Sequence, residues 1–61
     1  MPVVQIHLIQ GRSVEQKRAL VKKVTEAVCE SISVPAESVH VMLTDMKRED
    51  YADAGVLHLD R

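Results

Sequence analysis

The second residue of the chain, Pro2, is a candidate general base. A small second residue normally permits removal of the initiating methionine, and a chain that begins at Pro2 carries a secondary amine. An α-amino group has a reference pKa of about 8, and both burial and a neighbouring cation disfavour its protonated form. Because a general base works best with a pKa near the operating pH, an enclosed amine at Pro2 suits proton transfer near neutrality. If Met1 stays, the same nitrogen is an amide without useful basicity.

Arg12 is a second candidate, because it lies between the end of an expected strand and the start of an expected helix. A cation at a helix start opposes the helix dipole, so this position slightly favours a functional role over a structural one. A guanidinium group binds a carboxylate through two parallel hydrogen bonds. Taken alone, each of these two residues is a weak signal, and the case for proton transfer rests on the motifs that accompany them.

Three histidines and one cysteine complete the set of reactive side chains. His7, His40 and His58 lack the spacing of metal ligands, so we expect no metal site. We interpret His7 and His58 as structural, and His40 as either a site residue or a strand residue at a subunit interface. Cys29 falls on the expected solvated face of the helix, where a thiol lacks the cationic, enclosed setting of a nucleophile.

The first half of the chain has the pattern of a strand followed by a long helix. Residues Val3–Ile9 alternate between two faces, and Gly11 allows a tight turn. Ser13 and Gln16 have the spacing of a capping box, which predicts a helix over Val14–Ile32. The apolar stripe of this helix is expected to contain Leu20, Val24, Ala27, Val28 and Ser31, flanked by Val21 and Ile32.

The second half of the chain predicts a further strand and a short tail. Val34-Pro35 ends the helix, and Val39–Thr44 alternates as a strand. A polar turn follows, then a loop over Tyr51–Gly55 and a short terminal strand over Val56–Leu59. The fold class is therefore α/β. We expect a single β-α-β domain over residues 1–61, with two parallel strands, one long helix and a short C-terminal β segment.

A chain of 61 residues buries too little surface to fold securely alone. Its single cysteine rules out an intrachain disulfide, and the missing metal spacing leaves oligomerisation as the remaining source of stability. One sheet face, with Val3, Ile9 and Met42, has nothing in the chain to cover it. Since parallel sheets need cover on both faces, we expect other copies to cover it in a closed symmetric assembly.

Composition argues against several classes of partner. The formal net charge is −1, with charges of both signs spread along the chain, and Tyr51 is the only aromatic residue. Neither a basic patch nor a base-stacking platform for nucleic acid is therefore expected. No apolar run approaches the roughly 20 residues of a membrane span, and the N-terminus lacks the layout of a secretory signal. We expect a cytoplasmic protein that binds neither nucleic acid nor membrane.

The motifs are more specific in combination than alone. The segment from Pro2 to Lys17 includes Gln5-Ile6-His7-Leu8-Ile9-Gln10-Gly11-Arg12-Ser13, and Ser38-Val39-His40-Val41, Thr44-Asp45-Met46 and Tyr51-Ala52-Asp53-Ala54-Gly55 follow. Over nearly its whole length, without a gap, the chain closely resembles the 4-oxalocrotonate tautomerase family. The similarity is strongest from Pro2 to Lys17.

The resemblance implies a fold, an activity and a set of site residues. Members with this short chain are β-α-β subunits that assemble, typically into hexamers built as trimers of dimers. They interconvert enol and keto forms of unsaturated 2-oxo acids such as 2-hydroxymuconate, in the breakdown of aromatic compounds, without metal or cofactor. By resemblance, Pro2 is the base, Arg12 holds the distal carboxylate, Tyr51 forms an apolar wall and Ile9 contributes its backbone.

The chain departs from the family pattern at His40, which aligns with a second catalytic arginine that polarises the 2-oxo group. A protonated imidazole can donate one hydrogen bond to a developing oxyanion, but it lacks the two-pronged geometry of arginine. Arg61 or a side chain of another copy is an alternative donor. Ala52 and Ala54 stand where glycine is frequent, and Asp53 where an apolar residue is frequent, which predicts a stiffer and more polar loop.

Two alternative functions stay open at this point. Related family members hydrate haloacrylates or decarboxylate 3-oxo acids with a protonated proline, and Asp53 is a candidate for the water-activating acid here. The other alternative is a non-catalytic oligomerisation module, which retention of Met1 would favour.

Overall fold

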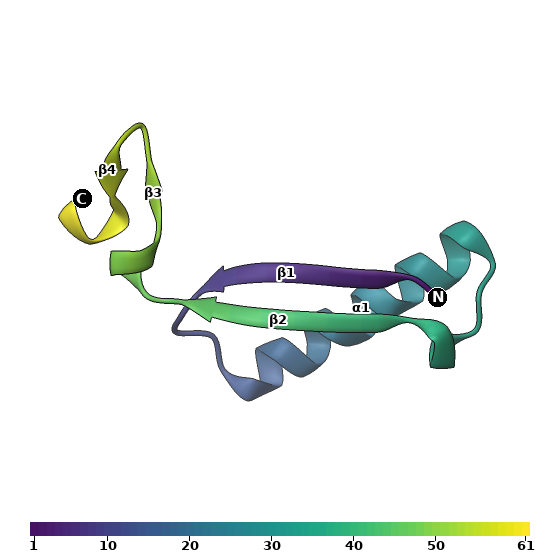
Figure 1. Ribbon diagram of the computed structural model, residues 1–61. Helices are drawn as coiled ribbons and strands as arrows, with labels where there is room; N and C mark the ends of the chain where they lie inside the picture. Colours follow the sequence, from purple (N-terminus) through teal and green to yellow (C-terminus); the bar gives the residue numbers. More distant parts are fainter.

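The computed structural model describes all residues from Met1 to Arg61, and its body is a β-α-β unit. Strand β1 (Val3–Ile9) is followed by helix α1 (Val14–Ile32) and strand β2 (His40–Met46), as Figure 1 shows. The two strands are parallel, in a register that runs from Val3 opposite His40 to Ile9 opposite Met46. The predicted fold class and the bounds of β1 and α1 are confirmed.

Strand β2 differs from the predicted Val39–Thr44 at both ends. It begins one residue later and continues to Met46, so that all seven residues of β1 find partners. The N–H of Gln10 extends the pairing by donating to the carbonyl of Met46 at 2.8 Å. A short 3₁₀ turn over Ala36–Ser38, which the sequence pattern did not predict, connects α1 to β2.

The start of α1 is fixed by the predicted capping box. The N–H of Gln16 donates to the Ser13 hydroxyl at 3.1 Å, and the N–H of Ser13 donates to the Gln16 side chain at 2.9 Å. The preceding turn uses Gly11 at a φ of +119°, where an added Cβ would meet no atom within 4 Å. The backbone conformation, rather than lack of space, therefore explains the glycine. No helix combines the length and apolar character that crossing a bilayer requires.

The face that α1 turns to the sheet is rotated from the predicted stripe. Leu20, Val24 and Val28 are half-buried as expected, but Ala27 and Ser31 are exposed. Val21, Thr25 and Cys29 are also half-buried, so the buried face lies further round the helix. The prediction that Cys29 lies on the solvated face is therefore wrong.

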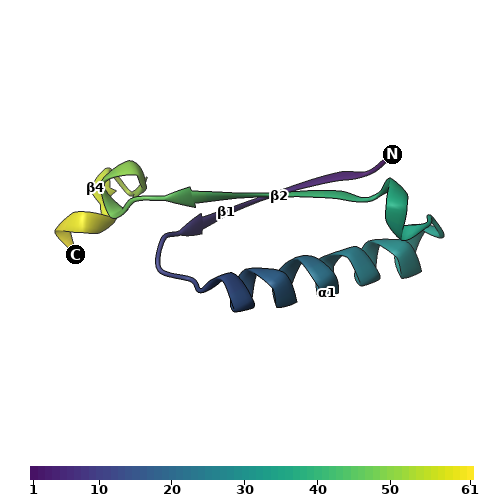
Figure 2. The same ribbon diagram turned by 90° about the horizontal axis from the view of Figure 1, so that it is seen from below.

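Helix α1 covers only one face of the two-stranded sheet, as Figure 2 shows edge-on. Val4, Ile6 and Leu8 are half-buried toward the helix, in the alternation that the sequence predicts. We call the other side the open face; it carries Val3 and Met42, which are 50% and 46% exposed. Nothing in this chain covers the open face.

Residues 51–61 form a C-terminal arm that extends beyond the β-α-β body (Figure 1). After a 3₁₀ turn over Arg48–Asp50, strands β3 (Ala52–Asp53) and β4 (Val56–Leu57) pair antiparallel. The predicted loop thus contains a strand, and the predicted terminal strand is shorter, because His58–Asp60 adopts a 3₁₀ turn.

The hairpin of the arm turns through Ala54 and Gly55, both at positive φ (51° and 78°). A two-residue turn with two positive φ values matches the right-handed twist of its strands. Arg61 closes the arm by forming an ion pair with Asp53 and donating to the carbonyl of Asp53 at 3.1 Å.

The isolated chain has no enclosed core, since none of its 61 residues is buried. Its accessible surface is 4682 Å², against about 4,000 Å² for a typical folded monomer of this mass. Its radius of gyration is 14.5 Å, against about 10.5 Å for a compact domain of this length. The flat shape, 43 × 24 × 13 Å, leaves apolar surface that partner chains can bury.

Candidate active site

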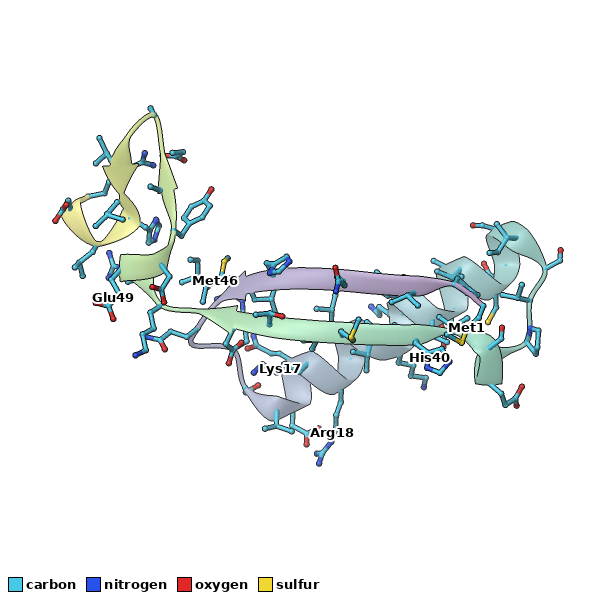
Figure 3. The ribbon with its side chains drawn as sticks, in the orientation of Figure 1. Met1, Lys17, Arg18, His40, Met46 and Glu49 are labelled. Atoms are coloured by element: carbon cyan, nitrogen blue, oxygen red, sulfur yellow. The ribbon has the colours of Figure 1, made fainter.

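Pro2 and His40 lie together where the two strands begin. The N–H of His40 donates to the carbonyl of Pro2 at 3.0 Å, and His40 pairs in register with Val3. In Figure 3, the labelled Met1 and His40 lie at the same end of the sheet. Pro2 is half-buried, whereas Met1 is 85% exposed. Removing Met1 would therefore free the Pro2 nitrogen without disturbing packed side chains.

Ile9 and Arg12 lie at the opposite end of the sheet. Ile9 is the last residue of β1 and pairs with Met46, which Figure 3 labels at the far end from His40. Arg12 follows in the turn before α1 and forms no ion pair with any carboxylate of the chain. Its guanidinium group is therefore available for an external carboxylate.

The two ends are too far apart to form one site within a chain. Six residue steps separate Val3 from Ile9, and at about 3.3 Å per step they span about 20 Å. Pro2 and Arg12 lie beyond these two ends, respectively. The fold thus places Pro2 and His40 at one end of the sheet and Ile9 and Arg12 at the other end.

A groove of about 310 Å³ lies beside Arg12, between the end of β1 and the first turns of α1. Its lining residues are Leu8, Arg12, Gln16, Lys17 and Leu20. Two leucines give it apolar walls, and the cations of Arg12 and Lys17 suit a small anion with a hydrocarbon body. Lys17 is a groove residue that the sequence pattern did not single out. Its position one helical turn from Leu20 was the available signal.

Lys17 is held by a carboxylate from β2. Its ammonium donates to Asp45 Oδ2 at 2.8 Å, and the two side chains are 29% and 46% exposed. Asp45 pairs in register with Leu8, which lines the groove. Figure 3 shows the labelled Lys17 beneath β2, toward the end of that strand. The ion pair therefore connects α1 to the strand end beside the groove.

Tyr51 lies at the base of the C-terminal arm. Its ring centroid is 5.9 Å from that of His58, with an interplanar angle of 58°, and its carbonyl accepts from the N–H of His58 at 2.8 Å. Tyr51 as a whole residue is 38% exposed. Within one chain, the arm follows the end of β2, which pairs with Ile9 of β1. Tyr51 therefore lies at the opposite end of the sheet from Pro2 (Figure 1).

Asp53 and Arg61 are occupied by one another in the arm. Arg61 therefore lies at the opposite end of the molecule from His40 and is engaged in an ion pair, which argues against its standing in for the missing arginine within a chain. No three side chains of the His, Cys, Asp or Glu types cluster in a way that would hold a metal ion.

Comparison with known proteins agrees with the fold. A family model described as a tautomerase enzyme matches residues 2–61. The chain is 51% identical over 55 residues to a probable tautomerase of Halalkalibacterium halodurans, with 90% of each chain covered. It is 42% identical over 57 residues to a 2-hydroxymuconate tautomerase of Pseudomonas putida, with 93% of this chain and 90% of that protein covered.

The fold is shared with solved tautomerases. A solved structure from work on the 4-oxalocrotonate tautomerase isozymes of Methylibium petroleiphilum superposes with a TM-score of 0.92 at 42% identity, covering 97% of this chain and 95% of that chain. A second structure, a 4-oxalocrotonate tautomerase homologue, gives a TM-score of 0.95 at 42% identity and covers 98% of each chain. The β-α-β subunit is thus that of a tautomerase. The chain belongs to the 4-oxalocrotonate tautomerase family.

Proposed function

We propose that the chain is a cofactor-independent keto–enol tautomerase of small unsaturated 2-oxo acids such as 2-hydroxymuconate, with the amine of Pro2 as its general base. The observation that carries the proposal is the division of the candidate residues between two ends of one strand. Pro2, the candidate base, lies at one end, and the guanidinium of Arg12, which has no ion-pair partner and lies beside a groove, lies at the other. Membership of a tautomerase family supports the reaction type.

A working site then requires at least two copies of the chain. The end with Arg12 and Ile9 of one copy must meet the end with Pro2 and His40 of another, since about 20 Å separate them within a chain. The isolated chain buries none of its residues, and the exposed Val3 and Met42 offer apolar surface for such contacts. A closed homo-oligomer, such as a hexamer built from three dimers, satisfies both needs.

The reaction needs only proton transfer. The neutral amine of Pro2 takes the proton of the 2-hydroxyl group, and the electron pair of that O–H bond forms the new C=O bond. The conjugated double bonds of the substrate shift, and one of its carbon atoms takes the proton back from the Pro2 ammonium. Arg12 holds the distal carboxylate through two hydrogen bonds. His40 donates to the oxygen on which charge develops, and Tyr51 supplies an apolar wall.

The test is a ketonisation assay on chain verified by mass spectrometry to begin at Pro2. We expect turnover of 2-hydroxymuconate and of phenylenolpyruvate. The matched control is the same chain with Met1 retained, whose Pro2 nitrogen is an amide and which should lose activity at least a hundredfold.

Two substitutions separate the roles of the base and the cation. Pro2→Ala leaves a primary amine, so kcat should fall only partly. Arg12→Ala should raise KM for the dicarboxylate at least tenfold, since a charge-assisted bidentate contact is lost. The proposal is wrong if chain that retains Met1 is as active as processed chain, or if both variants match the parent.

A further inference from the structure

We propose that Asp45 sets the charge of the groove beside Arg12, and that it thereby determines how strongly the site prefers dicarboxylates over monocarboxylates. The inference rests on the proposed role of Arg12 as the group that holds a distal carboxylate. The inference assigns a role in substrate specificity to Asp45 and Lys17, which the sequence pattern did not single out.

The groove brings together two cations from neighbouring segments. Arg12 comes from the turn after β1 and Lys17 from the second turn of α1, and both line the same groove of about 310 Å³. Leu8 and Leu20 form the apolar part of the lining. Without a counter-charge, this end of the chain would present two positive charges to a single carboxylate.

Asp45 removes one of these charges. The Lys17 ammonium donates to Asp45 Oδ2 at 2.8 Å, while Arg12 has no carboxylate partner in the chain. Lys17 and Asp45 are both partly exposed, at 29% and 46%, so this surface pair adds little to stability. Its main effect is to leave Arg12 as the one uncompensated cation of the groove.

The direction of each substitution follows from charge alone. Asp45→Asn frees the Lys17 ammonium to attract the distal carboxylate, which should tighten binding of a dicarboxylate. Lys17→Met leaves the negative charge of Asp45 uncompensated beside the groove, which should weaken binding of a dicarboxylate. In partly exposed surroundings, one unit charge a few ångströms from a carboxylate changes its binding by about three- to tenfold.

The experiment is calorimetric binding of two inert six-carbon dienes to the assembled full-length protein at low salt. Trans,trans-muconate has a carboxylate at both ends, and sorbate has a methyl group in place of one of them. We expect Asp45→Asn to raise the ratio of muconate to sorbate affinity about three- to tenfold and Lys17→Met to lower it by a similar factor. The double variant should return close to the parent ratio.

Controls separate charge from folding. Glu26→Gln changes the net charge as Asp45→Asn does, but it lies on the exposed side of α1 away from the groove, and it should leave the ratio unchanged. A purely structural ion pair predicts that both single variants shift the ratio in the same direction, or not at all, with equal losses of thermal stability. Either result overturns the inference, as does a parent that binds muconate no more tightly than sorbate.

The binding assay also separates this inference from the proposed function. Opposite shifts in the two single variants of a protein that fails the ketonisation assay would support the role of Asp45 and contradict the reaction. Ketonisation activity without opposite shifts in the two single variants would support the proposed reaction and contradict the role of Asp45.

Discussion

His40 is one of the residues at which this chain departs from the family pattern, and it aligns with an arginine there. Its backbone is fixed, because its N–H donates to Pro2 and its position is in register with Val3. Its side chain is exposed on β2, at the end of the sheet that carries Pro2, the proposed base. A histidine there supplies one donor to a developing oxyanion, where an arginine would supply two in a fixed fork.

Replacing His40 with arginine should therefore raise activity. We expect kcat/KM for 2-hydroxymuconate to rise about tenfold, since one well-placed oxyanion donor contributes about a hundredfold or more in comparable sites. Steady-state kinetics on processed chain measure the effect. Ser31→Arg, which adds the same cation at an exposed position of α1, serves as the control. An unchanged or lower kcat/KM for His40→Arg would place His40 outside the site.

At the scale of elements, the sequence pattern predicted the bounds of those helices and strands that are determined by interactions between neighbouring residues. The capping box at Ser13 and the alternation of Val3–Ile9 gave the bounds of α1 and β1, because each depends on residues within a few positions. Strand β2 was predicted too short because its end depends on pairing with β1, which the local pattern at Asp45 and Met46 does not reveal. The hairpin of the arm escaped prediction because Ala54, an alanine, occupies a turn position that usually carries glycine.

The cap of α1 offers a direct test of its contribution. Ser13→Ala removes the hydroxyl that accepts from the N–H of Gln16, and the free energy of unfolding should fall by about 1 kcal/mol per chain. Urea unfolding at a fixed protomer concentration measures it, since oligomers gain stability with concentration. Ser31→Ala, an exposed serine within the same helix, is the matched control and should lose nothing. Equal midpoints for the two variants would contradict the cap's contribution.

At the scale of the molecule, the candidate site was only partly predictable. Pro2, Arg12, His40, Tyr51 and Ile9 were all proposed from the sequence. Because β1 was predicted with its observed bounds, its length already placed Pro2 and Arg12 at least about 20 Å apart within one chain. What the sequence did not show is the groove beside Arg12, or the Lys17–Asp45 ion pair next to it, which joins residues 28 positions apart. Contacts of this kind depend on register and packing, which no local pattern encodes.

Subunit mixing tests whether the site is shared between chains. Arg12→Ala chains carry an intact base end, and Pro2→Leu chains, whose larger second residue is expected to keep Met1, carry an intact Arg12 end. After joint refolding at equal amounts, roughly a quarter of the sites should combine the two intact ends if each site draws on two chains. Activity should then exceed the sum of the separate variants. If each site lay within one chain, the activity of the mixture would equal the sum of the activities of the separate variants.

If Pro2 and Arg12 of different copies form one site as proposed, their position beyond the two ends of one strand also ties catalysis to the amount of protein made. A newly synthesised chain would then carry half of two different sites and a complete copy of neither. Output at low expression would then rise more steeply than the number of chains, by the law of mass action. A cell that makes few copies would gain almost no turnover from them until encounters between chains become frequent.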